Sequence, residues 1–542
     1  MTKYTSLIAL CFLLACTSKK KADLLVHNAT IYSVDSSFSI HEALAVKDGK
    51  ILAVGTNKDI LEKYSAKETV DAGGQYIYPG FIDAHCHFMG YGLGLQTANL
   101  VGTESWEAII DSLKSFSLKH PEGWVIGNGW DQNDWPSKVY PTNEQLNAIF
   151  PERPVILSRI DGHAAIANDK ALELAGIKVG QTLVGGEIEV KNGRLTGILI
   201  DNAVNLVYNK TPGITIPLLT AALVEAQANC FAMGLTTLDD CGINYNEVLL
   251  LDSLQKSGTI KMRIYAMLSD AKDNYTAIFA RGKIKTDRLN VRSFKVYADG
   301  ALGSRGACLL QPYSDQPGHR GFLLSNPEHY DSVAALIASK DFQMCTHAIG
   351  DSGNRIILNT YAKYLKGKNN LRWRIEHAQV INPEDFSKFG ANSIIPSVQP
   401  THATSDMYWA GERLGKEREK GAYAFKQLQG ENGWLALGTD FPVEDISPFK
   451  TFYAAVVRKD AKGYPESGYQ MENALTREDA LRGMTIWAAK SNFEESEKGS
   501  LEPGKMADFI LLDKNLLKAP PSELLSTRVI HTYLGGQRVF SR

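Results

Sequence analysis

Residues 79–87 read PGFIDAHCH, a short apolar strand that ends in two histidines separated by one residue. In an extended strand, residues i and i+2 face the same side, so His85 and His87 are expected to point together. Two imidazoles arranged in this way can chelate a metal ion. The alternative is a chance His-x-His on a loop. The motif therefore predicts a metal-binding strand end, and its weight depends on the rest of the chain.

Seven further apolar segments of strand length follow, and helical patterns fill several of the gaps between them. The clearest helix is LLTAALVEAQANCFAM, with apolar residues at helical spacing, Pro217 just before it and Gly234 as its C-cap. Eight strands that alternate with helices predict an α/β protein with a (β/α)8 (TIM) barrel. The eight predicted strands are residues 81–87, 235–240, 262–268, 293–299, 342–348, 372–378, 393–399 and 434–440.

Both ends of the chain read as short strands that lie outside this alternation. EALAVKD and ILAVG flank a hairpin turn at Asp48-Gly49, and ADFILLD and RVIHTYL follow each other near the C-terminus. Neither end alone makes a credible sheet. We therefore expect residues 23–78 and 490–542 to form one composite β-sandwich, and residues 79–489 to form the barrel.

The composition restricts the classes of function. With 542 residues, 58 Lys+Arg and 60 Asp+Glu, the net charge is −2. A near-neutral chain lacks the basic excess that a nucleic-acid binder needs, so we expect no nucleic-acid partner. Five cysteines lie beyond the first 16 residues, scattered and without a CxxC pair, which favours buried thiols over a disulfide framework.

The first 16 residues predict an export signal. Lys3 precedes the apolar run SLIALCFLLA, which is too short to span a bilayer, and LLAC, residues 13–16, resembles a bacterial lipobox. This interpretation places lipid on Cys16 and makes the protein an exported lipoprotein, anchored to a membrane on the periplasmic or cell-surface side. A plain secretory signal, or a buried helix in which Cys16 is incidental, is the alternative.

Three more of the predicted strands end in a candidate metal ligand: His347 in CTHAIGD, His377 in RIEHAQ and Asp440 in ALGTDFP. In barrels of this class the active site gathers at the carboxyl ends of the strands. Together with His85 and His87, these residues form a set suited to zinc or a similar divalent metal. A lone histidine of this kind is more often structural, but five candidate ligands at one face weaken that explanation.

Lys295 lies inside FKVYAD, a strand whose alternate residues should face the packed barrel interior. A buried ammonium is costly unless it is paired or its pKa falls. A salt bridge to Asp299 would satisfy it, and so would modification or tuning of the lysine by a nearby metal. Glu376, next to His377, is expected to point to the opposite side of its strand, so it is not a first choice for a ligand.

Six motifs in the order PGFIDAHCH, KVYADGALGSRGA, HAIGD, EHAQ, GTDFP and GSLEPGKMADFILLD resemble the amidohydrolase superfamily. The branch that they resemble is the amidohydrolase 3 type, which includes N-substituted formamide deformylases. The resemblance covers about residues 23–540. It implies a metal-dependent (β/α)8 barrel with a small β-sandwich built from both chain ends, in agreement with the strand pattern.

The resemblance also implies a metal site with one or two divalent ions, for which zinc is the expected metal. His85 and His87 would bind one ion, and His347 and His377 would hold the second. Lys295 would be carboxylated by carbon dioxide and would bridge the two ions through its carbamate oxygens. That modification would answer the burial problem, because it converts a cation into a bridging anion.

Asp440 would bind metal and act as the catalytic proton shuttle. A metal-activated hydroxide would attack an amide, N-formyl, N-acyl or cyclic amide carbonyl, and Asp440 would carry the proton to the leaving nitrogen. The implied activity is therefore that of an amidohydrolase acting on non-peptide carbon–nitrogen bonds of a small molecule. A deaminase or esterase on the same metal site is the alternative. A surface binding protein without chemistry is disfavoured, because all six ligand positions are filled.

Four further residues are candidates for substrate binding, each with a structural alternative. His163 could donate a hydrogen bond to a substrate carbonyl or could be a turn residue. Arg305 could meet a substrate carboxylate or could anchor its own loop by a salt bridge. His402, after the seventh strand, could line the site or cap the loop. Trp130, in GWVIGNGWDQNDWP, could line an apolar pocket or form a packed core.

Trp130 and His163 belong to a long segment between the first two barrel strands. That gap is too long for one crossover connection, so an insert at about residues 100–212 is expected to form a lid or a subdomain. The partners implied by the whole sequence are a small-molecule substrate and, through the lipid anchor alone, a membrane. The sequence leaves an oligomer open.

Overall fold

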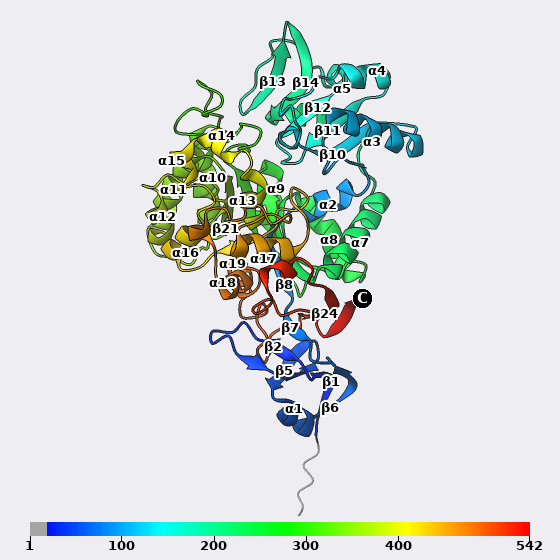
Figure 1. Cartoon of the computed structure of the whole chain (residues 1–542), viewed down its shortest axis with the longest axis vertical. Helices are drawn as coiled ribbons and strands as arrows, with labels where there is room; N and C mark the ends of the chain where they lie inside the picture. The colour runs from blue at the N-terminus through cyan, green and yellow to red at the C-terminus, as the bar shows by residue number, and fades with distance from the viewer. Residues whose placement is uncertain (1–18) are drawn as a thin grey trace, which may run out of the picture.

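The computed structural model describes residues 19–542, so the predicted export signal with Cys16 lies outside the described residues. Figure 1 shows the barrel in the middle of the molecule, the insert at one end, and sheets from the two ends of the chain at the other. Between residues 19 and 542, no helix combines the length and the apolar character that a membrane crossing requires.

Eight parallel strands form the barrel in chain order, and each predicted strand segment overlaps one of them. The strands are buried on both faces, as expected where helices cover a parallel sheet; β8 and β19, for example, are buried at every residue. The predicted fold class is therefore confirmed. The strands are β8 (Phe81–Cys86), β15 (Leu235–Ile243), β16 (Arg263–Ser269), β18 (Leu289–Tyr297), β19 (Gln343–Ala348), β20 (Arg374–His377), β21 (Ile395–Val398) and β22 (Ala436–Leu437).

The first and last strands are joined just beyond their regular ends, so the parallel sheet is nearly closed. The backbone N–H of Asp440 donates to the carbonyl of His85 at 2.8 Å, and the N–H of His87 donates to the carbonyl of Phe441 at 2.8 Å. Because parallel strands share one carboxyl edge, this closure brings residues more than 350 positions apart into direct backbone contact.

Helices connect the strands and cover the barrel. Helix α7 (Ile216–Ala232) begins at the N-cap Thr215, whose side chain accepts from the N–H of Leu218, and it is followed by Gly234 at φ +81°. The predicted helix is thus present, with Pro217 inside its first turn rather than before it. The other covering helices are α8 (Tyr245–Lys256), α9 (Lys272–Arg281), α10 (Pro327–Ser339), α11 (Asp351–Leu365), α12 (Phe386–Ala391), α16 (Phe425–Asn432), α17 (Pro448–Val457) and α19 (Ile486–Ser491).

Two further sheets pack against each other below the barrel. One is four-stranded, and the other pairs strands from both chain ends, with β7 hydrogen-bonded to β2 on one side and to β23 on the other. Side chains from both sheets, among them Val26, Val46, Ile77 and Phe509, share one buried cluster. The strands are β1 (Lys20–His27), β4 (Ala43–Lys47), β5 (Lys50–Gly55) and β6 (Tyr64–Asp71) in the first sheet, and β2 (Thr30–Tyr32), β3 (Ile40–His41), β7 (Tyr76–Pro79), β23 (Phe509–Leu512), β24 (Val529–Leu534) and β25 (Gln537–Ser541) in the second.

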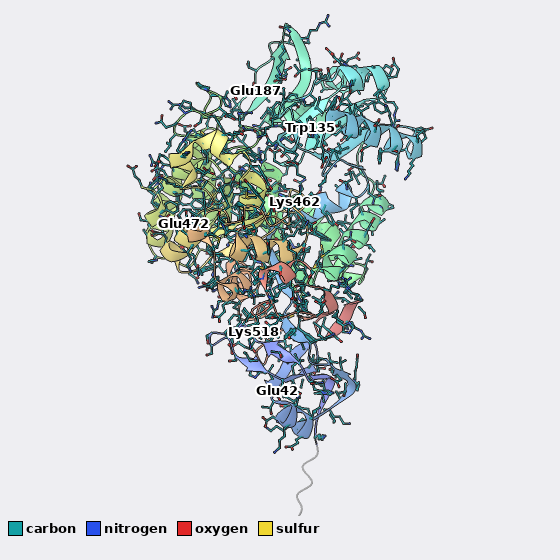
Figure 2. The ribbon with its side chains drawn as sticks, viewed as in Figure 1. Glu42, Trp135, Glu187, Lys462, Glu472 and Lys518 are labelled. Carbon is teal, nitrogen blue, oxygen red and sulfur yellow. The ribbon has the colours of Figure 1, made fainter. Side chains whose placement is uncertain are left out.

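The segment between β8 and β15 forms a mixed six-stranded sheet with its own buried cluster. Figure 2 shows Trp135 and Glu187 of this insert at the opposite end of the molecule from Glu42. Its strands are β9 (Ala98–Asn99), β10 (Val125–Trp130), β11 (Val155–Arg159), β12 (Ala164–Ala167), β13 (Gly186–Lys191) and β14 (Arg194–Asp201), and its α-helices are α3 (Trp106–Lys119), α4 (Glu144–Ile149), α5 (Asp169–Ala175) and α6 (Asn202–Tyr208).

The cysteines of the described chain support the prediction made from their spacing. All five, Cys86, Cys230, Cys241, Cys308 and Cys345, are free thiols, and four of them are buried. They act as small apolar side chains in the packed interior and add no cross-link to the fold.

Candidate metal centre

Imidazole rings from three barrel strands meet at the carboxyl edge of the sheet. The ring centroids of His85 and His377 are 4.7 Å apart, those of His347 and His377 are 4.6 Å apart, and those of His85 and His87 are 5.6 Å apart. The four histidines that the sequence predicted as ligands are therefore brought together. Their assignment as metal ligands stays a prediction, because the structure carries no ion.

Asp440 completes this group from the chain that follows β22. One ligand atom each of His85, His377 and Asp440 lies within 4.8 Å of the others. The Asp440 Oδ1 atom is 3.5 Å from His85 Nε2 and 3.3 Å from His87 Nε2. This oxygen is buried and has no hydrogen-bond partner. A buried carboxylate oxygen that faces two imidazoles is therefore free to bind a cation.

The backbone that presents Asp440 is held by a second carboxyl group. Asp440 has φ +65°, an uncommon value for a residue other than glycine. The preceding Thr439 donates from its N–H and its Oγ1 to Asp83 at 2.9 and 2.7 Å, and Asp83 also accepts from the N–H of His85 at 3.2 Å. Asp83 thus links the two strand ends that carry His85 and Asp440, which favours the strained conformation at the site.

The orientation of three imidazoles is set by acceptors on different strands. His85 Nδ1 lies 2.6 Å from Glu376 Oε2, and His377 Nδ1 lies 2.7 Å from Gln399 Oε1. His87 Nδ1 lies 2.9 Å from the carbonyl oxygen of Cys241. An Nδ1 that donates to such an acceptor leaves Nε2 with the lone pair that can bind a cation; this is the usual arrangement around metal-binding histidines.

The electrostatics of the group suit neutral imidazoles and an ionised carboxylate. Burial, together with the neighbouring Lys295, lowers the pKa of His85 to about 4. Burial opposes ionisation of Asp440, but the surrounding histidines, His85 first, outweigh it and lower the pKa of this carboxyl well below its ordinary value. Neutral imidazoles and carboxylates are the forms that bind cations.

Lys295 is fully buried at the bottom of this site. Its Nζ lies 3.1 Å from His85 Nε2 and 4.9 Å from the ring centroid of Tyr297. Within residues 19–542, no Asp or Glu oxygen lies within 4.0 Å of this Nζ. The salt bridge to Asp299 is absent, because Asp299 instead accepts the N–H groups of three residues, Cys308, Ile349 and Gly350.

The expectation for Glu376 was wrong. Its side chain is fully buried inside the barrel, in hydrogen-bond contact with His85, while His377 also faces the site. The strict alternation of a strand fails here because β20 ends at His377, whose φ is +72°, and the following Ala378 has φ +42°. The turn of the backbone therefore brings two consecutive side chains to the same region.

His163 reaches the centre from the insert. Its ring centroid is 4.9 Å from that of His347, and its Nδ1 lies 2.5 Å from Asp201 Oδ1. Asp201 has φ +50°, and a methyl group at Gly300 or Gly306 would lie 2.4 Å from its Oδ2. The strained backbone and the two glycines hold Asp201 behind His163. Burial lowers the pKa of His163, but the neighbouring Asp201 carboxylate outweighs burial and raises this pKa above its ordinary value.

His402 lies beside Asp440 rather than at a loop cap. Its Nε2 is 3.1 Å from Asp440 Oδ2, and its Nδ1 is 3.1 Å from Glu444 Oε1. Ser405 Oγ also donates to this Glu444 oxygen, at 2.6 Å. His402 therefore fixes one oxygen of the Asp440 carboxylate and leaves the other oxygen directed at His85 and His87.

Arg305 and Trp130 are occupied elsewhere. The Arg305 guanidinium donates to both oxygens of Asp315, at 3.3 and 2.8 Å, which is the loop-anchoring salt bridge considered as its alternative. Trp130 is fully buried in the core of the insert, and its Nε1 donates to the carbonyl of Leu157 at 2.8 Å. Both structural alternatives account for these side chains, so a substrate role for either is not supported.

Four residues that hold the site were not predicted to do so: Glu376 was set aside from the sequence, and Gln399, Asp201 and Glu444 were not considered. Each acts as an acceptor behind a histidine, and their distances from those histidines in the chain range from 22 to 291 positions. Glu376 and Gln399 do stand at or next to predicted strand ends, which is the one sequence signal that could have indicated them.

The chain is similar to known proteins over most of its length. The family model described as "Amidohydrolase family" matches residues 68–540. Protein LONG AFTER FAR-RED 3 of Arabidopsis thaliana is 32% identical over 539 residues, which cover 96% of this chain and 92% of that protein. The putative amidohydrolase YtcJ of Bacillus subtilis is 30% identical over 527 residues, covering 95% and 99%.

A relative with a named activity is more distant. The N-substituted formamide deformylase of Arthrobacter pascens is 25% identical over 547 residues, which cover 96% of this chain and 98% of that protein. Among solved structures, an uncharacterized metal-dependent hydrolase from Pyrococcus horikoshii superposes with a TM-score of 0.75 at 28% identity, covering 92% of this chain and 99% of the other. The similarity therefore extends over nearly the whole chain in both sequence and fold.

Proposed function

The chain belongs to the amidohydrolase family and is similar to a solved metal-dependent hydrolase, and from this premise we propose that it cleaves a non-peptide carbon–nitrogen bond of a small amide. The expected substrates are N-formyl or N-acyl amines and cyclic amides. The observation that carries the proposal is the convergence of His85, His377 and Asp440, whose ligand atoms lie within 4.8 Å of one another at the carboxyl edge of the barrel.

The residues fit a divalent cation on two independent counts. Asp440 Oδ1 is buried without a hydrogen-bond partner, and the buried Lys295 ammonium has no carboxylate within 4.0 Å in the chain from residue 19 onwards. A bound cation would give Asp440 Oδ1 a partner. Conversion of Lys295 to a carbamate would remove the cost of burying an unpaired ammonium. Nitrogen and oxygen donors together suit zinc, which we propose as the metal.

The resemblance placed His377 with His347 on a second ion, but its ligand atom lies within 4.8 Å of those of His85 and Asp440. We therefore assign His85, His87, His377 and Asp440 to one cation, with His347 and a carboxylated Lys295 available for a second one. A bound divalent cation would supply a Lewis acid that activates water and polarises a carbonyl group. The buried imidazoles exclude bulk water from this place, so electrostatic interactions there are stronger than at the surface.

Asp440 is the proposed acid–base group. His402 holds its Oδ2 at 3.1 Å, so Oδ1 is the oxygen that can accept a proton from the attacking water. The lowered pKa keeps this carboxylate ionised before the reaction begins. Asp440 then donates the same proton to the leaving nitrogen, so that the amine departs neutral and the carboxylate is restored.

His163 is the proposed substrate contact from the insert. Asp201 fixes its Nδ1, and its ring lies next to the row formed by His347 and His377, with its centroid 4.9 Å from that of His347. Asp440 stands at the other end of that row, 3.9 Å from His377 Nδ1. The two residues can therefore act on different atoms of one substrate, and we propose that His163 hydrogen-bonds the substrate carbonyl oxygen.

The proposal is tested by metal analysis of the purified protein, followed by rate assays with and without a chelator. The panel contains N-formyl amines, N-acyl amines, cyclic amides, esters and an aminated base. We expect hydrolysis of an amide that is lost with the metal and restored by zinc. Ester or base turnover alone would favour the alternative activities. Full metal content without turnover of any compound would refute a catalytic function.

We also propose that the chain is exported and lipid-anchored through Cys16. The support is the sequence alone: a short apolar run after Lys3 and the LLAC segment before the exposed Lys19 and Lys20. In a bacterial host, metabolic labelling with a fatty acid should mark the wild-type protein and not Cys16→Ser. Equal labelling of both would refute the anchor.

A further inference from the structure

A chain of buried charged groups crosses the barrel interior directly beneath the candidate metal centre. Glu376 is fully buried, and its two oxygens have different partners. Oε2 lies 2.6 Å from His85 Nδ1, and Oε1 accepts from Arg374 Nε at 2.7 Å. The carboxylate thus joins a candidate metal ligand to a buried guanidinium.

The Arg374 guanidinium is held on all of its nitrogens. One terminal nitrogen donates to Asp239 Oδ2 at 2.9 Å, and the other donates to the carbonyl of Ala84 at 3.0 Å. Ser491 and Asn492, from the segment at the end of α19, contribute further acceptors at 3.1 and 3.3 Å. A planar group with this many fixed partners cannot rotate, so Arg374 determines where the Glu376 carboxylate lies.

A carboxylate that is already ionised can only accept hydrogen bonds. Since Glu376 Oε2 faces His85 Nδ1, the proton of the imidazole is on Nδ1 and the lone pair is on Nε2, which faces Asp440. We propose that Glu376 is a positioning residue for the metal centre, an inference that rests on the metal site of the proposed function. Glu376 holds His85 in the ring orientation and tautomer that bind a cation, and Arg374 holds Glu376 in place.

The role of Glu376 differs from that of the acceptors behind the other histidines. His87 Nδ1 donates to a backbone carbonyl and His377 Nδ1 donates to the neutral amide of Gln399. His85 alone among these three has a charged acceptor, and a carboxylate behind a ligand raises its basicity as well as fixing its angle. We therefore expect metal affinity to depend more on Glu376 than on Gln399.

The burial of these charged side chains argues against a role in packing alone. Removing three charged groups from water is costly, and apolar residues of similar size often pack as well or better. The Arg374 guanidinium pairs with both Asp239 and Glu376, and Glu376 in turn contacts the candidate ligand His85. The buried ion pairs therefore end at the candidate metal centre.

The test measures zinc affinity of the metal-free protein by competition with a chromophoric chelator. We expect Glu376→Gln to weaken zinc binding by about 10–100-fold, the usual effect of removing such a partner. Glu376→Asp keeps the charge and the pair with Arg374 but withdraws the oxygen from His85, so it serves if the first variant does not fold. Glu384→Gln, an exposed carboxyl on the connection after β20, is the matched control and should bind as wild type.

A double-mutant cycle separates positioning from general support of the fold. If Glu376 acts through His85, then Glu376→Gln should cause no further loss of zinc affinity in a His85→Ala background. Additive losses, or wild-type affinity in both Glu376 variants, would overturn the proposal. Failure of the unmodified protein to bind zinc is a different result, which would refute the proposed metal centre itself.

Discussion

The barrel and the insert contribute to the same site by different routes. In the barrel, the side chains predicted at strand ends, His85, His347, His377 and Asp440, lie around one place. In the insert, His163 reaches that place while Trp130 is buried in a separate core. Parallel strands that share an edge fix where their ends point, whereas a mixed sheet with long loops gives no such rule.

The largest effect is expected at the barrel side of this comparison. Asp440→Asn should keep bound metal, because the imidazoles and the amide oxygen remain, but should lower kcat by about 10²–10⁴-fold through loss of the acid–base group. Steady-state rates and metal content check this. Asp445→Asn, a partly exposed carboxyl a few residues further on, should behave as wild type. A wild-type rate in Asp440→Asn would end the assignment.

The next effect tests whether the insert takes part in the reaction. His163→Ala removes one polar contact with the substrate, so kcat/KM should fall by about 10–100-fold while metal content stays unchanged. His120→Ala, at the exposed end of α3, is the control from the same insert. If His163→Ala and the control have equal kcat/KM, the insert acts only as a cover.

A smaller effect is expected for a residue in the core of the insert, away from the candidate substrate contact His163. Trp130→Phe removes the hydrogen bond to the Leu157 carbonyl and leaves unfilled volume, which should destabilise the insert by about 1–3 kcal/mol. Thermal unfolding should shift downwards while KM stays constant. A raised KM without a shift in unfolding would place Trp130 in the substrate site after all.

The smallest effect concerns a loop of the barrel. Arg305→Ala removes the ion pair with Asp315, whose partners are each about a quarter exposed, so stability should change by about 0–1 kcal/mol. Asp315 keeps its second partner, Arg413. KM should stay within about twofold of wild type, because the guanidinium is bound to Asp315 and is not free for a substrate. A tenfold rise in KM would show that Arg305 binds the substrate.

The barrel strands were easier to predict than the insert because their positions follow from a regular sequence pattern. Period-two alternation and chain order were enough to predict the eight strands and the convergence of the candidate ligands at their ends. The same alternation failed at Glu376, because the two positive φ values after it turn the backbone where the strand stops. Local irregularity of this kind is common at functional sites and leaves no periodic signal.

Partners that act across the fold were beyond prediction for a second reason. Asp201 lies 38 positions from His163, and Glu376 lies 291 positions from His85. A carboxyl group in an apolar strand shows only that it needs a partner, not which one it has. Lys295 was recognised as a buried charge by the same argument, yet the partner expected from the sequence, Asp299, turned out to bind backbone N–H groups.

The pairing of β7 with β23 has a consequence for biosynthesis. β7 runs directly into the first barrel strand, but its neighbour on one side is supplied by residues 509–512. A nascent chain leaving the ribosome therefore holds β7 with one edge open until almost all of the polypeptide has emerged, and open strand edges are prone to wrong pairing. Synthesis halted before residue 509 should yield a barrel whose first strand lacks its anchor.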